Sequence, residues 1–317
     1  MIRQLIFLGG IILIFAIIFA FQQDIPKTLT SVLNILQTNS STSSQNQTSN
    51  QTVSNNFTQK SIMPALFLAH GSPSIVIEKG PYIDFLTQLH KTIKTPKAIV
   101  IFSAHWESRF QQISSVQQYS TIYDFSGFPP EMYKIKYPAP GSPDLAKEIQ
   151  DMFTENEIAS FLDEKRGLDH GVWTLLKLIY PKADIPVVAL SVDPRSSPEE
   201  LFRIGSIVSS LREKEILVIG SGGTVHNLGR LNWGGNSIDK WALGFDNWLE
   251  ERINSWNTEE LFEYKTKAPF ARDAVPTPEH FIPIFVALGA GSSTKNASLL
   301  HRSYQYGSLS YMSWRFD

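Results

Sequence analysis

The chain has 317 residues, of which 42% are hydrophobic, 12% aromatic and 18% charged, and its formal net charge is −2. This composition excludes wholesale disorder, collagen and a multi-span transporter, and the charge argues against a nucleic-acid binder because no basic stretch accompanies it. The sequence has no cysteine and seven histidines. Disulfides, thiolate zinc sites and cysteine nucleophiles are therefore excluded, and any metal must be held by nitrogen and oxygen ligands.

The first sixty residues differ in composition from the rest of the chain. The apolar run LIFLGGIILIFAIIFAF carries no charged side chain and would cover about 25 Å as a helix. Residues 1–23 therefore predict a membrane anchor or, as the alternative, a signal peptide. Residues 24–60 are rich in Ser, Thr, Asn and Gln and predict a flexible tether. We expect residues 61–317 to form a domain anchored on the extracytoplasmic side of a membrane, or secreted if the leader is cleaved.

From residue 61 onward, short apolar runs alternate with helical patterns, which is typical of a single α/β domain with a mostly parallel or mixed sheet covered by helices. Apolar runs predict four strands, at 65–69, 98–103, 185–191 and 215–220. Amphipathic spacing predicts helices at 143–153, 171–180 and 198–212, the last opened by a capping box of Ser197 and Glu200. A stripe from Ile238 to Ile253 indicates a further core-facing helix. Residues 303–316, with Gly307 between aromatic-rich arms, predict an edge hairpin.

Three histidines follow three of the predicted strands. His70 comes directly after the first strand, His105 directly after the second, and His226 a few residues past the fourth, beyond a Gly-Ser-Gly-Gly turn. Because ligands bind at the carboxyl ends of strands in open α/β sheets, we expect these imidazoles at one edge. A single histidine at a strand end is usually a satisfied polar residue, but three at corresponding positions predict a metal site.

Two further histidines also lie at the ends of predicted elements. His280 is expected in the first turn of a helix that starts at Pro278 and is capped by Thr277. His170 comes just before the helix at 171–180. Carboxylates beside the histidines could complete a site of two histidines and one carboxylate: Glu107, Asp169 and Glu279. Such ligands suit iron, zinc or copper.

Five motifs in chain order carry a family resemblance: AHGSP at 69–73, SAHWE at 103–107, LDHGVW at 168–173, GSGGTVHNL at 220–228 and PTPEHFIP at 276–283. Together they resemble the class III extradiol ring-cleaving dioxygenases, and among these the 4,5-DOPA extradiol dioxygenase subgroup, over nearly all of residues 62–317. The resemblance implies an oxidoreductase that incorporates both atoms of O₂ into a catecholic ring. It also implies one Fe(II) or Zn(II) ion held by His70, His105, His226 and His280.

The resemblance implies roles for two histidines beyond metal binding. His170 matches a histidine that would hydrogen-bond substrate or oxygen. His226 is either a ligand or the acid/base that takes the catechol proton, since a catalytic ion must keep open positions. The segment Asn227-Leu228 departs from the proline-containing segment of the plant betalain-forming enzymes, so DOPA is not assumed as the substrate. Candidate cavity walls, for which core packing is the commoner role, are Tyr82, Trp106, Phe125, Phe128 and Trp173.

Two other interpretations stay open at this point. One is a non-enzymatic metal-binding or signalling module on the same fold, because a fold does not fix its chemistry. The other is a zinc-dependent hydrolase, with a carboxylate base such as Glu107 acting on a metal-bound water. For the dioxygenase, the expected partners are a catecholic small molecule, O₂ and, through the N-terminal helix, a membrane, but no nucleic acid.

Overall fold

The computed structural model describes residues 62–234 and 237–317. The predicted anchor at 1–23, the predicted tether at 24–60 and the predicted start of the domain at residue 61 lie outside this part of the chain, so those predictions stay predictions. In the two described ranges, no helix is both long enough and apolar enough to cross a membrane.

An eight-stranded mixed sheet forms the centre of the domain, with the strand order β4-β3-β5-β2-β6-β1-β10-β7. Its middle consists of four parallel strands: β5 (Val187–Val192), β2 (Ala98–Glu107), β6 (Ile216–Gly222) and β1 (Ala65–Ala69). On one side β3 (Gln111–Ser114) and β4 (Ser160–Asp163) are added, and on the other β10 (Ser313–Phe316) and β7 (Ala297–His301). The predicted α/β class with a mixed sheet is confirmed.

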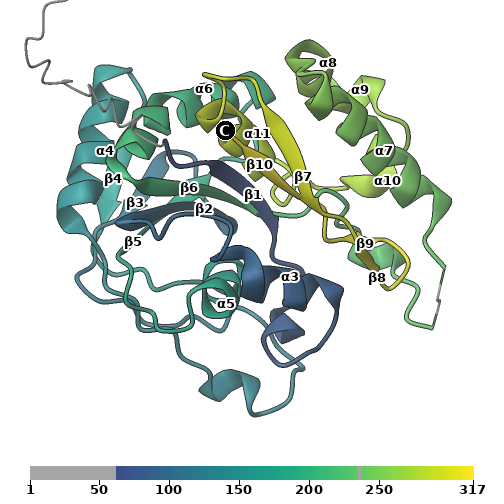
Figure 1. Ribbon diagram of the computed structural model, residues 1–317, viewed down its shortest axis with the longest axis horizontal. Helices are drawn as coiled ribbons and strands as arrows, with labels where there is room; N and C mark the ends of the chain where they lie inside the picture. Colours follow the sequence, from purple (N-terminus) through teal and green to yellow (C-terminus); the bar gives the residue numbers. More distant parts are fainter. Residues whose placement is uncertain (1–61, 235–236) are drawn as a thin grey trace, which may run out of the picture. The chain divides into compact units, whose positions relative to one another are not determined.

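Helices cover both faces of this sheet (Figure 1). One face carries α4 (Pro143–Glu155), α6 (Pro198–Val208) and α11 (Pro283–Ala290), and the other carries α3 (Pro81–Leu89) and α5 (His170–Ile179). Strand β1 shows why the apolar runs are continuous: Ala65 and Phe67 belong to one buried core, and Leu66 and Leu68 to the other. A strand covered on both faces needs apolar side chains at every position.

The remaining helices lie in the connections between strands, and several of them pack against the core that contains Ala65 and Phe67. A second helical group consists of α7 (Lys240–Asn254), α8 (Thr258–Phe262), α9 (Tyr264–Lys267) and α10 (Ala271–Ala274). Short 3-10 helices occur at η1 (Pro73–Val76), η2 (Met132–Lys134), η3 (Ser209–Lys214) and η4 (Leu228–Arg230). The predicted stripe on α7 is buried at Phe245, Trp248 and Ile253 but is wrong for Ile238, which precedes the helix and is 47% exposed.

Two predicted boundaries near the site are wrong. Strand β2 continues to Glu107, so His105 lies inside the strand rather than after it. Residues 278–282 form a turn instead of the start of a helix, and α11 begins only at Pro283, which occupies its first turn. Proline fits there because its missing N–H would have no partner in the first turn anyway.

The C-terminal segment is also different from the predicted edge hairpin. β8 (Tyr304–Gln305) and β9 (Leu309–Ser310) form a separate two-stranded sheet, with Gly307 in the turn at φ +80°. The chain then continues into β10, which lies between β1 and β7 within the main sheet. Alternating side chains identify a strand but do not say which neighbours it pairs with.

Candidate metal centre

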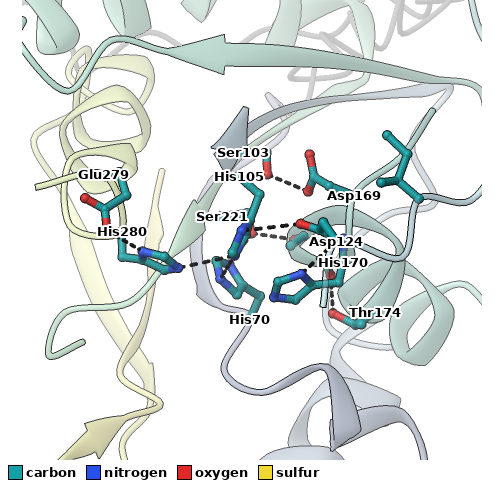
Figure 2. A network of polar contacts seen from close by, with 12 residues as sticks. His70, Ser103, His105, Asp124, Asp169, His170, Thr174, Ser221, Glu279 and His280 are labelled. Atoms are coloured by element: carbon teal, nitrogen blue, oxygen red, sulfur yellow. Dashed lines mark hydrogen bonds and ion pairs between the residues drawn. The ribbon is translucent and has the colours of Figure 1, made fainter. Parts of the chain in front are cut away.

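Three of the predicted histidines bring their Nε2 atoms together at the carboxyl edge of the parallel strands (Figure 2). Nε2 of His105 lies 2.9 Å from Nε2 of His70 and 3.2 Å from Nε2 of His280. His70 follows β1, His105 lies near the end of β2, and His280 lies in the turn before α11. The sequence thus places three imidazoles from distant segments at one point, which we call the three-histidine cluster.

The turn that carries His280 reaches the cluster because it packs directly on the end of β6. The N–H of Gly223 donates to the carbonyl oxygen of His280 at 2.8 Å. A Cβ atom on Gly222 would lie 2.0 Å from that oxygen, far closer than atoms can approach. Glycine at 222 is therefore required for this contact, and β6 lies between β1 and β2, so the turn arrives beside the other two histidines.

The tautomer of His70 follows from its hydrogen bonds. Its Nδ1 atom lies 2.9 Å from Oγ of Ser221, and that hydroxyl donates to the carbonyl oxygen of Gly171 at 2.5 Å. Because the hydroxyl has a single proton, it must accept from His70, so Nδ1 of His70 carries the hydrogen. The Nε2 atom that faces the cluster is then an unprotonated lone pair.

Carboxylates favour the same tautomer in the other two histidines, through a hydrogen bond at His280 and a longer contact at His105. Nδ1 of His280 lies 3.0 Å from Oε1 of Glu279, and Nδ1 of His105 lies 3.4 Å from Oδ2 of Asp124. Burial alone would raise the pKa of Glu279, but hydrogen bonds from His280 and Thr277 lower that pKa to about 2. Burial is likewise outweighed at Asp124, whose pKa falls to about 2 through its contacts with the histidines. Both carboxylates are ionised at neutral pH and hold the imidazole protons at Nδ1.

The donor set fits a divalent metal ion. Burial and then the neighbouring imidazoles lower the pKa of His105 to about 2 and the pKa of His70 well below its usual value, so these rings stay neutral. Lone pairs that face each other at 2.9 and 3.2 Å repel unless a cation lies between them. Metal–nitrogen bonds of about 2.0–2.1 Å would place neighbouring ligand nitrogens about 2.9–3.4 Å apart. The observed separations fall in that interval.

Asp124 also contacts His170. This carboxylate therefore connects His105 of the three-histidine cluster with His170, which lies outside it. Oδ1 of Asp124 accepts from the backbone N–H of His170 at 3.0 Å and lies 3.0 Å from its Nδ1. Figure 2 shows this carboxylate between the rings of His105 and His170, whose centroids are 3.9 Å apart. The sequence analysis missed Asp124, which lies in a loop without periodic pattern and next to no motif.

A buried network fixes the backbone behind His105. The hydroxyl of Ser103 donates to Asp169 at 2.7 Å, and Arg166 donates to both Asp169 and the carbonyl oxygen of His105, at 3.1 and 2.9 Å. The Asp169 carboxylate therefore accepts hydrogen bonds from Ser103 and Arg166 and lies outside the three-histidine cluster. Glu107 is exposed and lines a separate hollow with Arg109 and Asp193, so neither carboxylate completes the metal centre.

His226, the fourth predicted ligand, lies beside the cluster rather than in it. Its ring stacks on that of His280 with centroids 3.5 Å apart and planes 6° from parallel. His226 forms a group of possible ligands with His280 and Glu279, whereas the group that contains both His70 and His105 is completed by His280. Burial and then His280 lower the pKa of His226 to about 3, so the ring is neutral at neutral pH.

A cavity of about 430 Å³ opens beside the cluster. Its polar end is formed by four histidines and Asp124: His105, His170, His226 and His280. Two of the predicted aromatic walls, Phe125 and Phe128, line it, whereas Tyr82, Trp106 and Trp173 are buried in the core below the sheet. The cavity therefore offers room for a small ring directly next to four imidazole side chains.

Comparisons with known proteins agree with this geometry. The family model described as "Catalytic LigB subunit of aromatic ring-opening dioxygenase" matches residues 64–316. The chain is 40% identical to "4,5-DOPA dioxygenase extradiol" of Beta vulgaris over 262 residues, which cover 81% of this chain and 98% of that protein. It is 36% identical to the protein of the same name in Escherichia coli K12, covering 79% and 93% of the two chains.

A solved structure has the same fold. The crystal structure of an uncharacterized protein from Escherichia coli K12 superposes with a TM-score of 0.69 at 33% sequence identity. The match covers 80% of this chain and all of that one.

Proposed function

The chain belongs to the LigB family of aromatic ring-opening dioxygenases, which are oxidoreductases, and on that premise we propose that it is a metal-dependent extradiol dioxygenase. It opens a catecholic ring next to the hydroxyl groups and incorporates both atoms of O₂. The observation that carries the proposal is the three-histidine cluster, in which each Nε2 is free and each Nδ1 faces an acceptor. His70, His105 and His280 would hold Fe(II) or Zn(II), with iron as the ion for ring cleavage.

With His70, His105 and His280 as its protein ligands, the ion would keep positions available for a substrate in the cavity. When bound, the ion would acidify the catechol hydroxyls and provide the electron path between the ring and O₂. The protein contributes the position of the ring: Phe125 and Phe128 line the same cavity as the histidines, so a catechol would direct its hydroxyls to the imidazoles and its ring to the aromatic side chains. The aromatic walls exclude water from the face of the ring.

Two histidines outside the cluster handle protons. His226 lines the cavity and is neutral, so it can accept a catechol proton and return it to the opened product. His170 also lines the cavity, and ionised Asp124 lies 3.0 Å from its Nδ1 atom. A proton on Nδ1 would face that carboxylate, and Nε2 would then be the atom that accepts a hydrogen bond from a substrate hydroxyl. A passive metal store would need neither group.

Oxygen uptake by the full chain tests the proposal. The protein is stripped of metal, loaded anaerobically with Fe(II) or with Zn(II), and mixed with a catechol panel that includes DOPA and protocatechuate. We expect iron-dependent uptake with one O₂ consumed per ring and a yellow ring-opened product. Stoichiometric iron binding without uptake on any catechol would contradict the proposal.

A further inference from the structure

Beyond the histidines and Asp124, most side chains of the cavity wall are apolar, and the polar exceptions among the described residues are the hydroxyl groups of Ser72, Ser74, Ser126 and Tyr306. The apolar part of the wall is formed by side chains from the loop after β3, from the segment after β6 and from β9: Phe125, Phe128, Leu228, Leu231, Trp233 and Leu309. Two of these are strongly exposed at the mouth, Leu228 at 60% and Trp233 at 72%. Trp233 also packs on Tyr306, with ring centroids 4.5 Å apart. Exposed apolar side chains that rim a cavity mark a surface to be covered by an apolar ligand group.

The charged residues in and near the cavity also favour an uncharged ligand group. Among the described residues that line it, none is a lysine or arginine, and Asp124 is the carboxylate. Arg230 is adjacent in sequence to this wall, but its guanidinium pairs with Asp273 at 2.5 Å and lies over the ring of Trp241. The hydroxyls of Ser72 and Ser74 are bonded to each other at 2.7 Å. A carboxylate entering this cavity would lose water without gaining a cation.

We infer that the substrate is a catechol whose substituent is uncharged and apolar, an alkyl or aryl group that extends from the ring toward Leu228 and Trp233. The inference rests on the proposed function and narrows its substrate class. The ring lies at the histidines, the substituent covers the exposed mouth, and a carboxylate there would find no cationic partner among the described residues that line the cavity. Catechols of the DOPA and protocatechuate type, which carry a carboxylate, are then poor substrates.

Matched catechols test the inference in two ways. Propylcatechol and dihydroxyphenylpropanoate have nearly the same shape and differ by the carboxylate, while methylcatechol lacks two methylenes. Each buried methylene is worth about a fourfold gain in affinity. We expect propylcatechol to exceed both methylcatechol and dihydroxyphenylpropanoate by about tenfold in kcat/KM with iron. The same order is expected in Kd with the zinc-loaded chain, read from quenching of tryptophan fluorescence.

A charge placed in the wall gives the decisive comparison. Leu231 is half-buried in the wall, so a long polar side chain at this position can reach the cavity. Leu231→Arg should raise the ratio of kcat/KM for dihydroxyphenylpropanoate over propylcatechol at least tenfold relative to Leu231→Gln, which is polar but uncharged. The Kd ratio for the zinc-loaded variants should move in the same direction.

The outcomes separate this inference from the proposed function. If the zinc-loaded chain prefers propylcatechol in Kd but iron supports no cleavage of any catechol, the proposed function fails and the substrate class stands. If rings are cleaved but dihydroxyphenylpropanoate is used as well as propylcatechol, or Arg and Gln at position 231 behave alike, the substrate class is overturned.

Discussion

Asp124→Asn removes a carboxylate that contacts both His105, a proposed ligand, and His170, a proposed proton-transfer group. Asn keeps a single acceptor oxygen, and its amide group would face imidazole N–H groups that need an acceptor. His170 makes two contacts of 3.0 Å with this side chain, whereas His105 makes one of 3.4 Å. The substitution should therefore disturb the tautomer of both rings, and that of His170 more strongly.

Loss of such a partner usually costs about 10- to 100-fold in metal affinity or activity, or about 1.4–2.8 kcal/mol. The contact to His105 is the longer one, so we expect the Kd for Fe(II) to rise by only about tenfold. The contacts to His170 are shorter, so we expect kcat/KM for the best catechol to fall by about 100-fold. Metal affinity is measured by competition with a chelator, and kcat/KM by oxygen uptake at saturating iron.

Asp84→Asn is the matched control, because Asp84 is exposed on α3 and makes no side-chain contact with the site. It removes the same charge and should leave both quantities within twofold of wild type. If Asp124→Asn keeps the thermal midpoint, metal affinity and kcat/KM of the control, the role assigned to Asp124 is refuted.

Three further predictions concern single contacts. His226→Ala should lower kcat by about 100-fold while leaving metal content by elemental analysis at one ion per chain; loss of the ion would make His226 a ligand instead. Gly222→Ala places a Cβ against the carbonyl oxygen of His280, so it should destabilise the fold by about 1–3 kcal/mol in urea and weaken metal binding; a wild-type urea midpoint would contradict this packing. Ser221→Ala removes the acceptor of the His70 proton and should weaken metal affinity by about tenfold, while Ser221→Thr, which keeps the hydroxyl, should recover most of it.

The parallel core and the position of the site could be predicted because both depend on local patterns. The four predicted strands overlap β1, β2, β5 and β6, since strands covered on both faces are continuous apolar runs. Once these strands are parallel, their carboxyl ends share one edge, and histidines that follow them must be neighbours. That rule brought His70 and His105 together without knowledge of the structure.

Asp124 and the neighbours of β10 could not be predicted because they depend on contacts between distant segments. Asp124 is 46 residues from His170 and lies in an irregular loop, where nothing in the sequence says which side chain it meets. The segment at 303–316 has the strand pattern, but whether it adds at an edge or between two strands is decided by β7, which the sequence analysis did not identify. For His280, helical composition around Pro278 was overridden by the close packing of the turn on Gly222.

Labelled oxygen gives the most direct test of the central claim. The iron-loaded full chain is supplied with heavy-isotope O₂ and its best catechol, and the product is reduced at once to trap the aldehyde oxygen before it exchanges with water. The account predicts a ring-opened product that carries two labelled oxygen atoms and is absent from the His105→Ala variant. A product whose new oxygen comes from water, or one that forms equally in His105→Ala, would contradict the account.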